Sequence, residues 1–455
     1  MTKFTQASLF ITTAAAWLIA LAGHASAQGN AGVVVDAAGV LSVKTFADPT
    51  GALTRRRLME AKAALDGDLA RPSDMRKLSL TRLEAAVARS IERGEGIPDE
   101  MKNLAGLTKI QYVFFYPETK DIVIAGPAEG YFQDLSGRAV GIVSGQSILQ
   151  LEDLVVALRA FGPDGRRTGQ IGCSIDPTPE GLQRMQQFLA RIGGRATPRD
   201  TQFIVNGLRE SLGKQNVRVE GVSPETHFAQ VMVEADYRMK LIGIGLERPE
   251  ARIPSYVSKA NPASIARNAL LRWYFVPNYE CVRVSEDEAA MELVGDGVKL
   301  VGADELVKDG GVRVASGAVD RAGLAFVHTF TEQYPHLART SPVFGQLKNL
   351  IDMAITAAFI QDRDWYGRAG WNMRFFGDER AFPVAKHTAP KQVDSAVNAI
   401  WKGHTLMTPI GGGVEINARR ALESEKMLDD EDGKLAESYE KLDLSKLPAE
   451  QWWWD

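Results

Sequence analysis

Residues 110–125, which read IQYVFFYPETKDIVIA, decide the fold class of this chain. Two runs rich in β-branched and aromatic residues, 110–116 and 122–125, flank a polar segment that has the composition of a turn. This pattern predicts a β-hairpin. Because both runs are apolar on both faces, we expect the hairpin in the interior of a sheet and not at its edge.

Upstream of this hairpin, the sequence predicts a second hairpin and two helices. Residues 32–46 contain two valine-rich runs around a turn-type cluster, and residues 53–65 and 80–91 have the composition and spacing of helices. Thr81 and Glu84 have the spacing of a capping box, which favours a helix start at this point.

Downstream of the hairpin, strands and helices alternate. Residues 170–175 read as a strand, and Thr178-Pro179 supplies an N-cap and a first-turn proline for a helix that ends at Gly193. Thr197-Pro198 predicts another helix start by the same device. Apolar residues between 228 and 242 recur at helical spacing, and a strand over 228–233 is the competing interpretation.

The later part of the chain changes character. Residues 273–301 read as consecutive short strands, and residues 316–360 carry two apolar stripes at helical spacing that should pack together. The glycines at 411–413 are interpreted as a flexible turn, because no helix or phosphate-binding lysine accompanies them. Together these patterns predict an α+β fold with a mixed α/β middle section, antiparallel hairpins and a helical C-terminal layer.

The composition is that of an ordinary globular protein. The 455 residues are 45% hydrophobic and 24% charged, with a net charge of −4. This near balance disfavours bulk binding to nucleic acid. The length implies several domains. We predict a signal peptide (1–27), an N-terminal hairpin with helices (28–107), an α/β domain (108–195), an α+β domain (196–310), a helical region (311–420) and an acidic tail ending in Trp-Trp-Trp (421–455).

The first 27 residues have the organisation of an export signal. Lys3 precedes an apolar run over residues 9–22, and small residues stand at Ala25 and Ala27. We predict cleavage between Ala27 and Gln28. The alternative is an uncleaved membrane anchor, but the run is shorter than the roughly 20 residues that span a bilayer. The later apolar stretch at 350–360 has the length of a core helix, so no membrane span is expected after cleavage.

Export would place the two cysteines, Cys173 and Cys281, in an oxidising compartment. Both lie in strand-like stretches. A disulfide between them and a pair of buried free thiols are therefore both open interpretations.

Candidate chemistry is sparse. The common phosphate-binding, zinc-protease and serine-hydrolase motifs are absent from the sequence, and no metal or cofactor site is predicted. The densest ionisable cluster is His227, Glu234 and Asp236, in which His227 and Glu234 share one face of the predicted helix. A solvated helix face is the simpler interpretation, so these residues are the candidates for catalysis only if the protein is an enzyme.

Three tryptophans, Trp452, Trp453 and Trp454, stand near the end of the sequence. They could stack on sugars, dock a partner or fold back onto the body. Folding back is the preferred interpretation, because burial of a single indole contributes a few kcal/mol.

Residues 137–161, GRAVGIVSGQSILQLEDLVVALRAF, resemble the later part of a PDZ domain. Gly145, Leu151, Asp153, Leu154 and Leu158 match its pattern of a strand, a glycine turn and an E-D-L-V-x-A-L helix. The resemblance implies a groove beside that helix in which a peptide binds as an added strand, with Leu151, Leu154 and Leu158 among the binding residues.

A longer resemblance covers residues 40–361. The segments GALTRRRLMEA, AGLTKIQYVFFYPETKDIVIAGPAEGY, LQLEDLVVALRAF, GCSIDPTPEGLQRMQQF, THFAQVMVEADYRMKLIGIGLE and RWYFVPNYECVRVSEDEAAMELVGDGVKLV resemble the secreted, planctomycete-type family named domain of unknown function 1598. The resemblance implies export. It implies no activity, because none is established for the family.

The sequence therefore predicts an exported, periplasmic or extracellular protein with a non-catalytic binding or structural role at the cell envelope. Its expected partner is an unidentified protein or peptide. A PDZ-like peptide-binding module and a hydrolase of unrecognised type are the alternatives.

Overall fold

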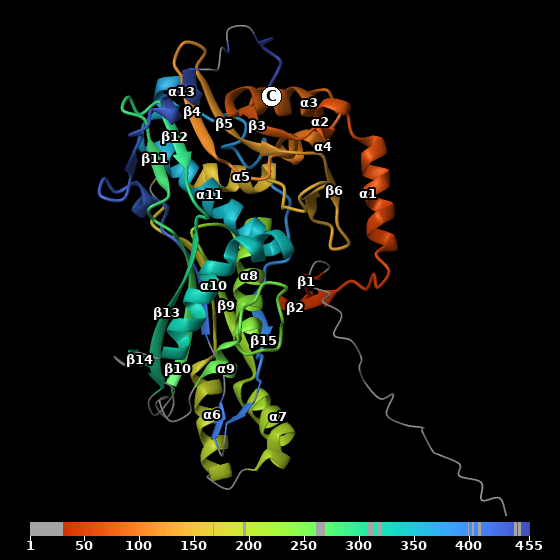
Figure 1. Cartoon of the computed structure of the whole chain (residues 1–455), viewed down its shortest axis with the longest axis vertical. Coiled ribbons are helices and arrows are strands. Elements are labelled where there is room, and N and C mark those ends of the chain that lie inside the picture. The colour runs from red at the N-terminus through yellow and green to blue at the C-terminus, as the bar shows by residue number, and fades with distance from the viewer. Residues whose placement is uncertain are drawn as a thin grey trace, which may run out of the picture.

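A computed structural model describes residues 31–166, 168–193, 197–260, 269–307, 313–315, 321–398, 400–402, 405–407, 411–440, 444 and 447–455. Two large sheets and several helices confirm the α+β class (Figure 1). The predicted signal peptide and its cleavage site between Ala27 and Gln28 lie outside the described residues.

The larger sheet has nine strands and draws on distant parts of the sequence. Its order is β1 (Ala31–Val35), β2 (Val40–Thr45), β15 (Gln392–Asp394), β9 (Lys214–Glu220), β8 (Ile171–Asp176), β18 (Gly411–Ile416), β10 (Ala269–Pro277), β13 (Val298–Val307) and β14 (Arg313–Ala315). The hairpin predicted over 32–46 is β1–β2. Two strands from late in the sequence complete the sheet: β15 joins this hairpin to β9, and β18 joins β8 to β10.

Strand β18 corrects the interpretation of the glycine run. Gly411–Ile416 is a strand between β8 and β10, and not a flexible turn. A Cβ on Gly412 would lie 1.9 Å from the carbonyl oxygen of Trp273, and one on Gly413 would lie 2.1 Å from that of Cys173. The glycines let the neighbouring backbones approach this strand closely.

Helices cover the nine-stranded sheet and extend beyond it. Helix α8 (His227–Gly243) packs on β8 and β18, and α10 (Arg321–Thr340) packs on β13 and on the short α9 (Tyr256–Lys259). A paired extension of α6 (Pro179–Ile192) and α7 (Thr201–Leu212) lies at the lower end of the molecule in Figure 1.

The two threonine–proline helix starts behave differently. Thr178 caps α6 as predicted, since its hydroxyl accepts from Gly181 N at 3.0 Å. The start predicted at Thr197 is wrong for the α-helix, because Pro198–Asp200 forms a 3-10 turn before α7.

The second sheet has seven strands and contains the hairpin of residues 110–125. Its order is β19 (Leu428–Asp429), β11 (Val282–Val284), β12 (Ala290–Leu293), β4 (Tyr112–Tyr116), β5 (Asp121–Ala128), β3 (Ser73–Ser79) and β20 (Trp453–Trp454). The hairpin β4–β5 is internal, which confirms the prediction. The strands expected over 273–301 divide between the two sheets.

Shorter elements surround this sheet. The helices are α1 (Ala52–Ala64), α2 (Gly67–Ala70), α3 (Leu80–Glu92), α4 (Asp99–Lys102), α5 (Leu151–Ala160), α12 (Trp365–Ala369) and α13 (Lys434–Glu440). Helix α1 lies at the right edge of Figure 1. Two small hairpins are formed by β6 (Tyr131–Gln133) with β7 (Ala139–Gly141) and by β16 (Ile400–Lys402) with β17 (Thr405–Met407).

The capping box predicted for α3 is wrong in detail. Ser79 is the N-cap, and its hydroxyl accepts from Arg82 N at 3.2 Å. Thr81 lies inside the helix, and Glu84 is turned into the core, where it accepts hydrogen bonds from residues near α12.

The core of the molecule is organised around helix α11 (Pro342–Asp362). It packs against α5, α8 and α10, and its residues are buried from Pro342 to Leu347 and from Asn349 to Ile360. Its length and composition would also suit a membrane-spanning helix, but 89% of its most apolar window is buried within the protein. We therefore assign α11 as a core helix.

Candidate functional site

Helix α8 carries the three candidate residues and joins the two halves of the molecule. Thr226 caps it by accepting from Ala229 N at 3.2 Å, so His227 occupies the first turn. The helix packs on the nine-stranded sheet with one face and on α5 and α11 with another. The helical interpretation of this segment is confirmed, and the alternative strand is wrong.

His227 is paired with a carboxylate from another helix. Its Nδ1 lies 2.9 Å from Oδ2 of Asp153, which is buried in the first turn of α5. Burial alone would lower the pKa of His227, but the adjacent Asp153 carboxylate outweighs burial and raises it. The arrangement is a carboxylate-oriented imidazole, which can hold or move a proton.

A second histidine lies beside this pair. The rings of His227 and His387 are 5.8 Å apart between centroids, and the backbone N–H of His387 donates to Glu225 O at 2.8 Å. Burial and the neighbouring His227 lower the pKa of His387. Glu152 precedes Asp153 in the first turn of α5, and burial together with the Asp153 carboxylate raises the pKa of Glu152 to about 6.

Glu234 belongs to a different cluster. It forms ion pairs with Arg138 and with Nη1 of Arg238 at 3.5 Å, and Arg238 also contacts Glu247 at 2.9 Å. Arg138 donates to Gln346 Oε1 at 2.8 Å, and a further donation reaches the backbone of β1. Glu234 is therefore the centre of a buried network that ties α8 to α11 and to the β6–β7 hairpin region.

Asp236 points into a third environment. Its Oδ2 accepts from Lys240 Nζ at 2.8 Å, and the same ammonium donates to Ile175 O at 3.1 Å on strand β8. Burial raises the pKa of Asp236 to about 6 although Lys240 opposes the shift. This pair fastens α8 to the nine-stranded sheet.

The structure therefore does not bring His227, Glu234 and Asp236 into one site. Two cavities lie elsewhere: one of about 560 Å³ beside Lys259 and α10, and one of about 340 Å³ between the loop after α5 and α12. None of the three residues lines either cavity. Among the residues that the structure describes, no three His, Cys, Asp or Glu side chains are placed to share a metal ion.

The leucines suggested by the PDZ resemblance lie in the core. Leu151 is 2% exposed, and Leu154 and Leu158 are fully buried, because α5 packs against α11 and α8. The face that would line a peptide groove is thus occupied by the protein's own helices.

The two cysteines are separate in the structure. Cys173 lies in β8 of the larger sheet and Cys281 directly before β11 of the smaller one; both are buried free thiols. Burial raises the pKa of Cys281 to about 12 and also raises that of Cys173. The structure therefore has the pair of buried thiols and not the disulfide.

The tryptophans near the end of the sequence fold back onto the seven-stranded sheet. Trp453 and Trp454 form β20, which pairs antiparallel with Leu78 and Lys77 of β3. Trp452 and Trp454 are 7% and 9% exposed, and Trp452 O accepts from Ser79 N at 2.9 Å.

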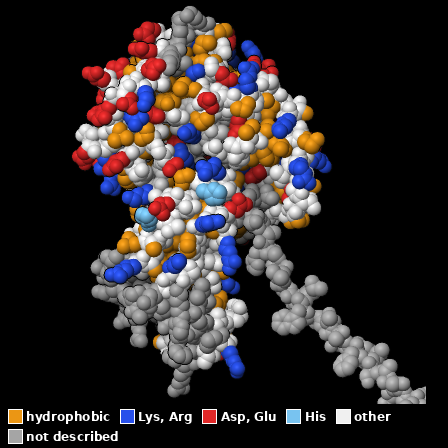
Figure 2. All heavy atoms as spheres, viewed as in Figure 1, with side chains coloured by type: hydrophobic (Ala, Val, Ile, Leu, Met, Phe, Trp, Pro, Cys, Tyr) orange, Lys and Arg blue, Asp and Glu red, His pale blue; other side chains and the backbone are white. Residues whose placement is uncertain are grey.

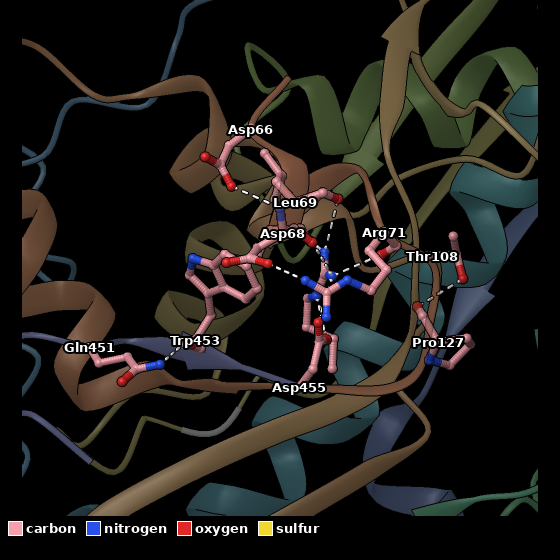
Figure 3. A network of polar contacts seen from close by, with 11 residues as sticks. Asp66, Asp68, Leu69, Arg71, Thr108, Pro127, Gln451, Trp453 and Asp455 are labelled. Atoms are coloured by element: carbon pink, nitrogen blue, oxygen red, sulfur yellow. Dashed lines mark hydrogen bonds and ion pairs between the residues drawn. The ribbon is translucent and has the colours of Figure 1, made fainter. Parts of the chain in front are cut away.

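An ion pair also holds these last residues against β3. The guanidinium of Arg76, which is fully buried, donates to the two carboxylate oxygens of Asp455 at 2.8 and 3.0 Å (Figure 3). The same guanidinium lies 4.6 Å from the ring centroid of Trp453. Sequence analysis pointed to the tryptophans but missed both Arg76 and Asp455, because no local pattern marks either residue.

The acidic segment that begins at residue 421 forms a solvated surface. Figure 2 shows acidic side chains gathered at the upper left of the molecule, where α13 lies in Figure 1. Its exposed carboxylates include Asp432 and Glu423, which pair with the lysines Lys434 and Lys426. Local ion pairs thus neutralise part of this acidic charge.

Comparison with known proteins identifies one segment. Residues 173–256, which extend from within β8 to the start of α9, match the family described as a protein of unknown function (DUF1598). The resemblance is thereby confirmed over this segment, which contains α8. No curated protein and no solved structure matches the chain.

Proposed function

We propose that this chain, whose residues 173–256 match a family of unknown function, is an exported, non-catalytic binding protein of the cell envelope. The sequence of residues 1–27 supports export, because a cation, an apolar run and the small residues Ala25 and Ala27 follow one another in the order of a cleaved leader.

The observation that carries the non-catalytic role is the separate pairing of the charged residues of α8. Glu234 faces Arg138, Asp236 faces Lys240, and His227 faces a carboxylate of α5. A catalytic site needs such groups within reach of one reacting atom. The pairs with Arg138 and Asp153 join α8 to other segments, and the Asp236–Lys240 pair lies within α8 and reaches β8 through Lys240. The charges therefore support the architecture and leave recognition to the surface.

Two measurements test this proposal. Mass spectrometry of the protein recovered from outside the cytoplasm should give a first residue of Gln28, and a chain lacking residues 1–27 should stay in the cytosol. The mature protein should then sediment saturably with a washed cell-envelope fraction, and the same protein after thermal unfolding serves as the control. Recovery of the full chain in the cytosol, or failure of the folded protein to sediment, would contradict the proposal.

Acid–base chemistry at His227 is a second candidate function, favoured by its contact with Asp153 and by the nearby His387. Such an enzyme should hydrolyse activated ester substrates, and His227→Gln should abolish that turnover while the fold is retained. Asp236→Asn, which changes a separate charged pair on the same helix, is the matched control. Equal turnover by both variants would exclude this function.

A further inference from the structure

Strand β3 pairs with the last residues of the sequence through a short stretch of main-chain hydrogen bonds. The register aligns Trp453 with Leu78 and Trp454 with Lys77, and one further hydrogen bond runs from Ser79 N to Trp452 O. On its other side β3 pairs with β5, so β20 occupies the outer edge of the sheet. An edge of this kind recognises an extended segment without regard to its side chains.

Side-chain recognition at this edge comes from Arg76. Its Nη1 donates to Ala105 O at 2.7 Å, and its Nη2 donates to Asp68 O and Arg71 O, each at 3.0 Å. An additional, longer contact of 3.3 Å joins Nη1 to Leu69 O. The main chain around α2 and before β4 therefore orients the guanidinium, and the register of β3 against β5 shifts between Ser73 and Arg76.

Two side chains of the folded-back segment contact this guanidinium. Nε and Nη2 meet the carboxylate of Asp455 in a two-point contact, which is the geometry that suits a carboxylate best (Figure 3). The indole of Trp453 covers one face of the guanidinium. Among the described residues, the other hydrogen-bond acceptors of this guanidinium lie within residues 68–105, so these contacts form without the folded-back segment.

We propose that the β3 edge with Arg76 is an acceptor site for an extended peptide of a partner protein that carries a tryptophan two residues before an aspartate, and that residues 451–455 keep this site closed. The inference rests on the proposed binding function and names its site and ligand class. A partner segment displaces β20, pairs with Leu78 and Lys77, and places its carboxylate on Arg76.

The direct test uses a chain that ends at Glu450 and a fluorescent peptide of sequence Gln-Trp-Trp-Trp-Asp. The folded truncated chain should bind this peptide saturably at one site, whereas the chain through Asp455 should bind it far more weakly. A peptide with asparagine in place of the aspartate should bind about tenfold more weakly or worse, because it loses the charge-assisted pair. Absence of binding, or equal binding of the two peptides, overturns the proposal.

A second, full-length variant tests the proposal even if the truncated chain does not fold. Full-length Asp455→Asn keeps the segment and loosens its hold on Arg76, so it should bind the aspartate peptide more tightly than the unaltered protein does. Equal affinities would refute an exchangeable segment. Sedimentation with the envelope fraction is a separate measurement on the unaltered protein, so failure of the acceptor site and failure of the proposed function give different results.

Discussion

The indole N–H of Trp371 donates to the buried carboxylate of Glu84, which links the segment after α12 to helix α3. The other oxygen of Glu84 accepts from the backbone N–H groups of Phe375 and Phe376 at 2.8 and 2.7 Å. One carboxylate thus satisfies three donors of an irregular segment that contains little regular structure of its own.

Removal of this carboxylate should destabilise the protein strongly. Glu84→Ala leaves three donors without an acceptor in a buried environment, so we expect the free energy of unfolding to fall by about 3 kcal/mol. Chemical denaturation followed by tryptophan fluorescence measures the change. Glu92→Ala, at an exposed position of the same helix, is the control and should change stability by less than about 0.5 kcal/mol.

Glu152 should make stability depend on pH. Its pKa in the folded protein is about 6, above the value of 4.5 for the free side chain, so the folded state binds the proton more tightly. The resulting stabilisation is present below pH 4.5 and is lost as the pH rises through 6. Glu152→Gln should remove this contribution, so its advantage over the unaltered protein should grow from pH 4.5 to pH 7. A constant difference across that range would contradict the assignment.

The pairing of Asp153 with His227 should be visible in the titration of the histidine. The raised pKa of His227 depends on the Asp153 carboxylate, so Asp153→Asn should lower it. NMR of the imidazole protons measures this shift. Asp164→Asn, at an exposed position beyond the same helix, is the matched control, and an unchanged His227 titration in Asp153→Asn would show that the pair does not form in solution.

Gly412 should tolerate no side chain. Alanine there would put its Cβ 1.9 Å from the carbonyl oxygen of Trp273, so β10 and β18 would have to separate. We expect Gly412→Ala to cost about 3 kcal/mol of stability. Gly169→Ala is the control, because a Cβ at Gly169 meets no heavy atom within 4 Å. Equal melting temperatures for the two variants would contradict the placement of β18.

The two thiols should react only after unfolding. Cys173 and Cys281 are buried, and burial raises the pKa of both, so a maleimide should label neither in the folded protein and both in denaturant. Mass spectrometry without reductant gives the count. A protein that stays unlabelled in denaturant until it is reduced would instead contain the disulfide.

Local patterns predicted the elements better than their assembly. The hairpin β4–β5, the start of α6 at Thr178 and the helical spacing of α8 depend on neighbouring residues and were predicted correctly. Glu84 shows the limit of such patterns, because the capping box predicted with Thr81 does not form and the partners of Glu84 lie near Trp371. Arg76 and Asp455 are 379 positions apart, and no local pattern relates two such residues.

The candidate site was predictable only as a list of residue types. Helical spacing placed His227 and Glu234 on one face of α8, but their partners Asp153 and Arg138 come from segments that the fold brings there. Asp236 pairs with Lys240 four residues later on the same helix, whereas the partners of His227 and Glu234 come from other segments and could not be predicted from α8 alone. Packing of α8 between the sheet and α11 decides that outcome.

The position of β18 has a consequence for synthesis of the protein. This strand lies between β8 and β10, so the nascent chain cannot close the larger sheet before residue 416 has emerged from the ribosome. Pairings between segments so distant in sequence form slowly, since a long loop must close first. The strand order thus delays cotranslational folding until most of the polypeptide exists, a delay that would favour the export that we propose.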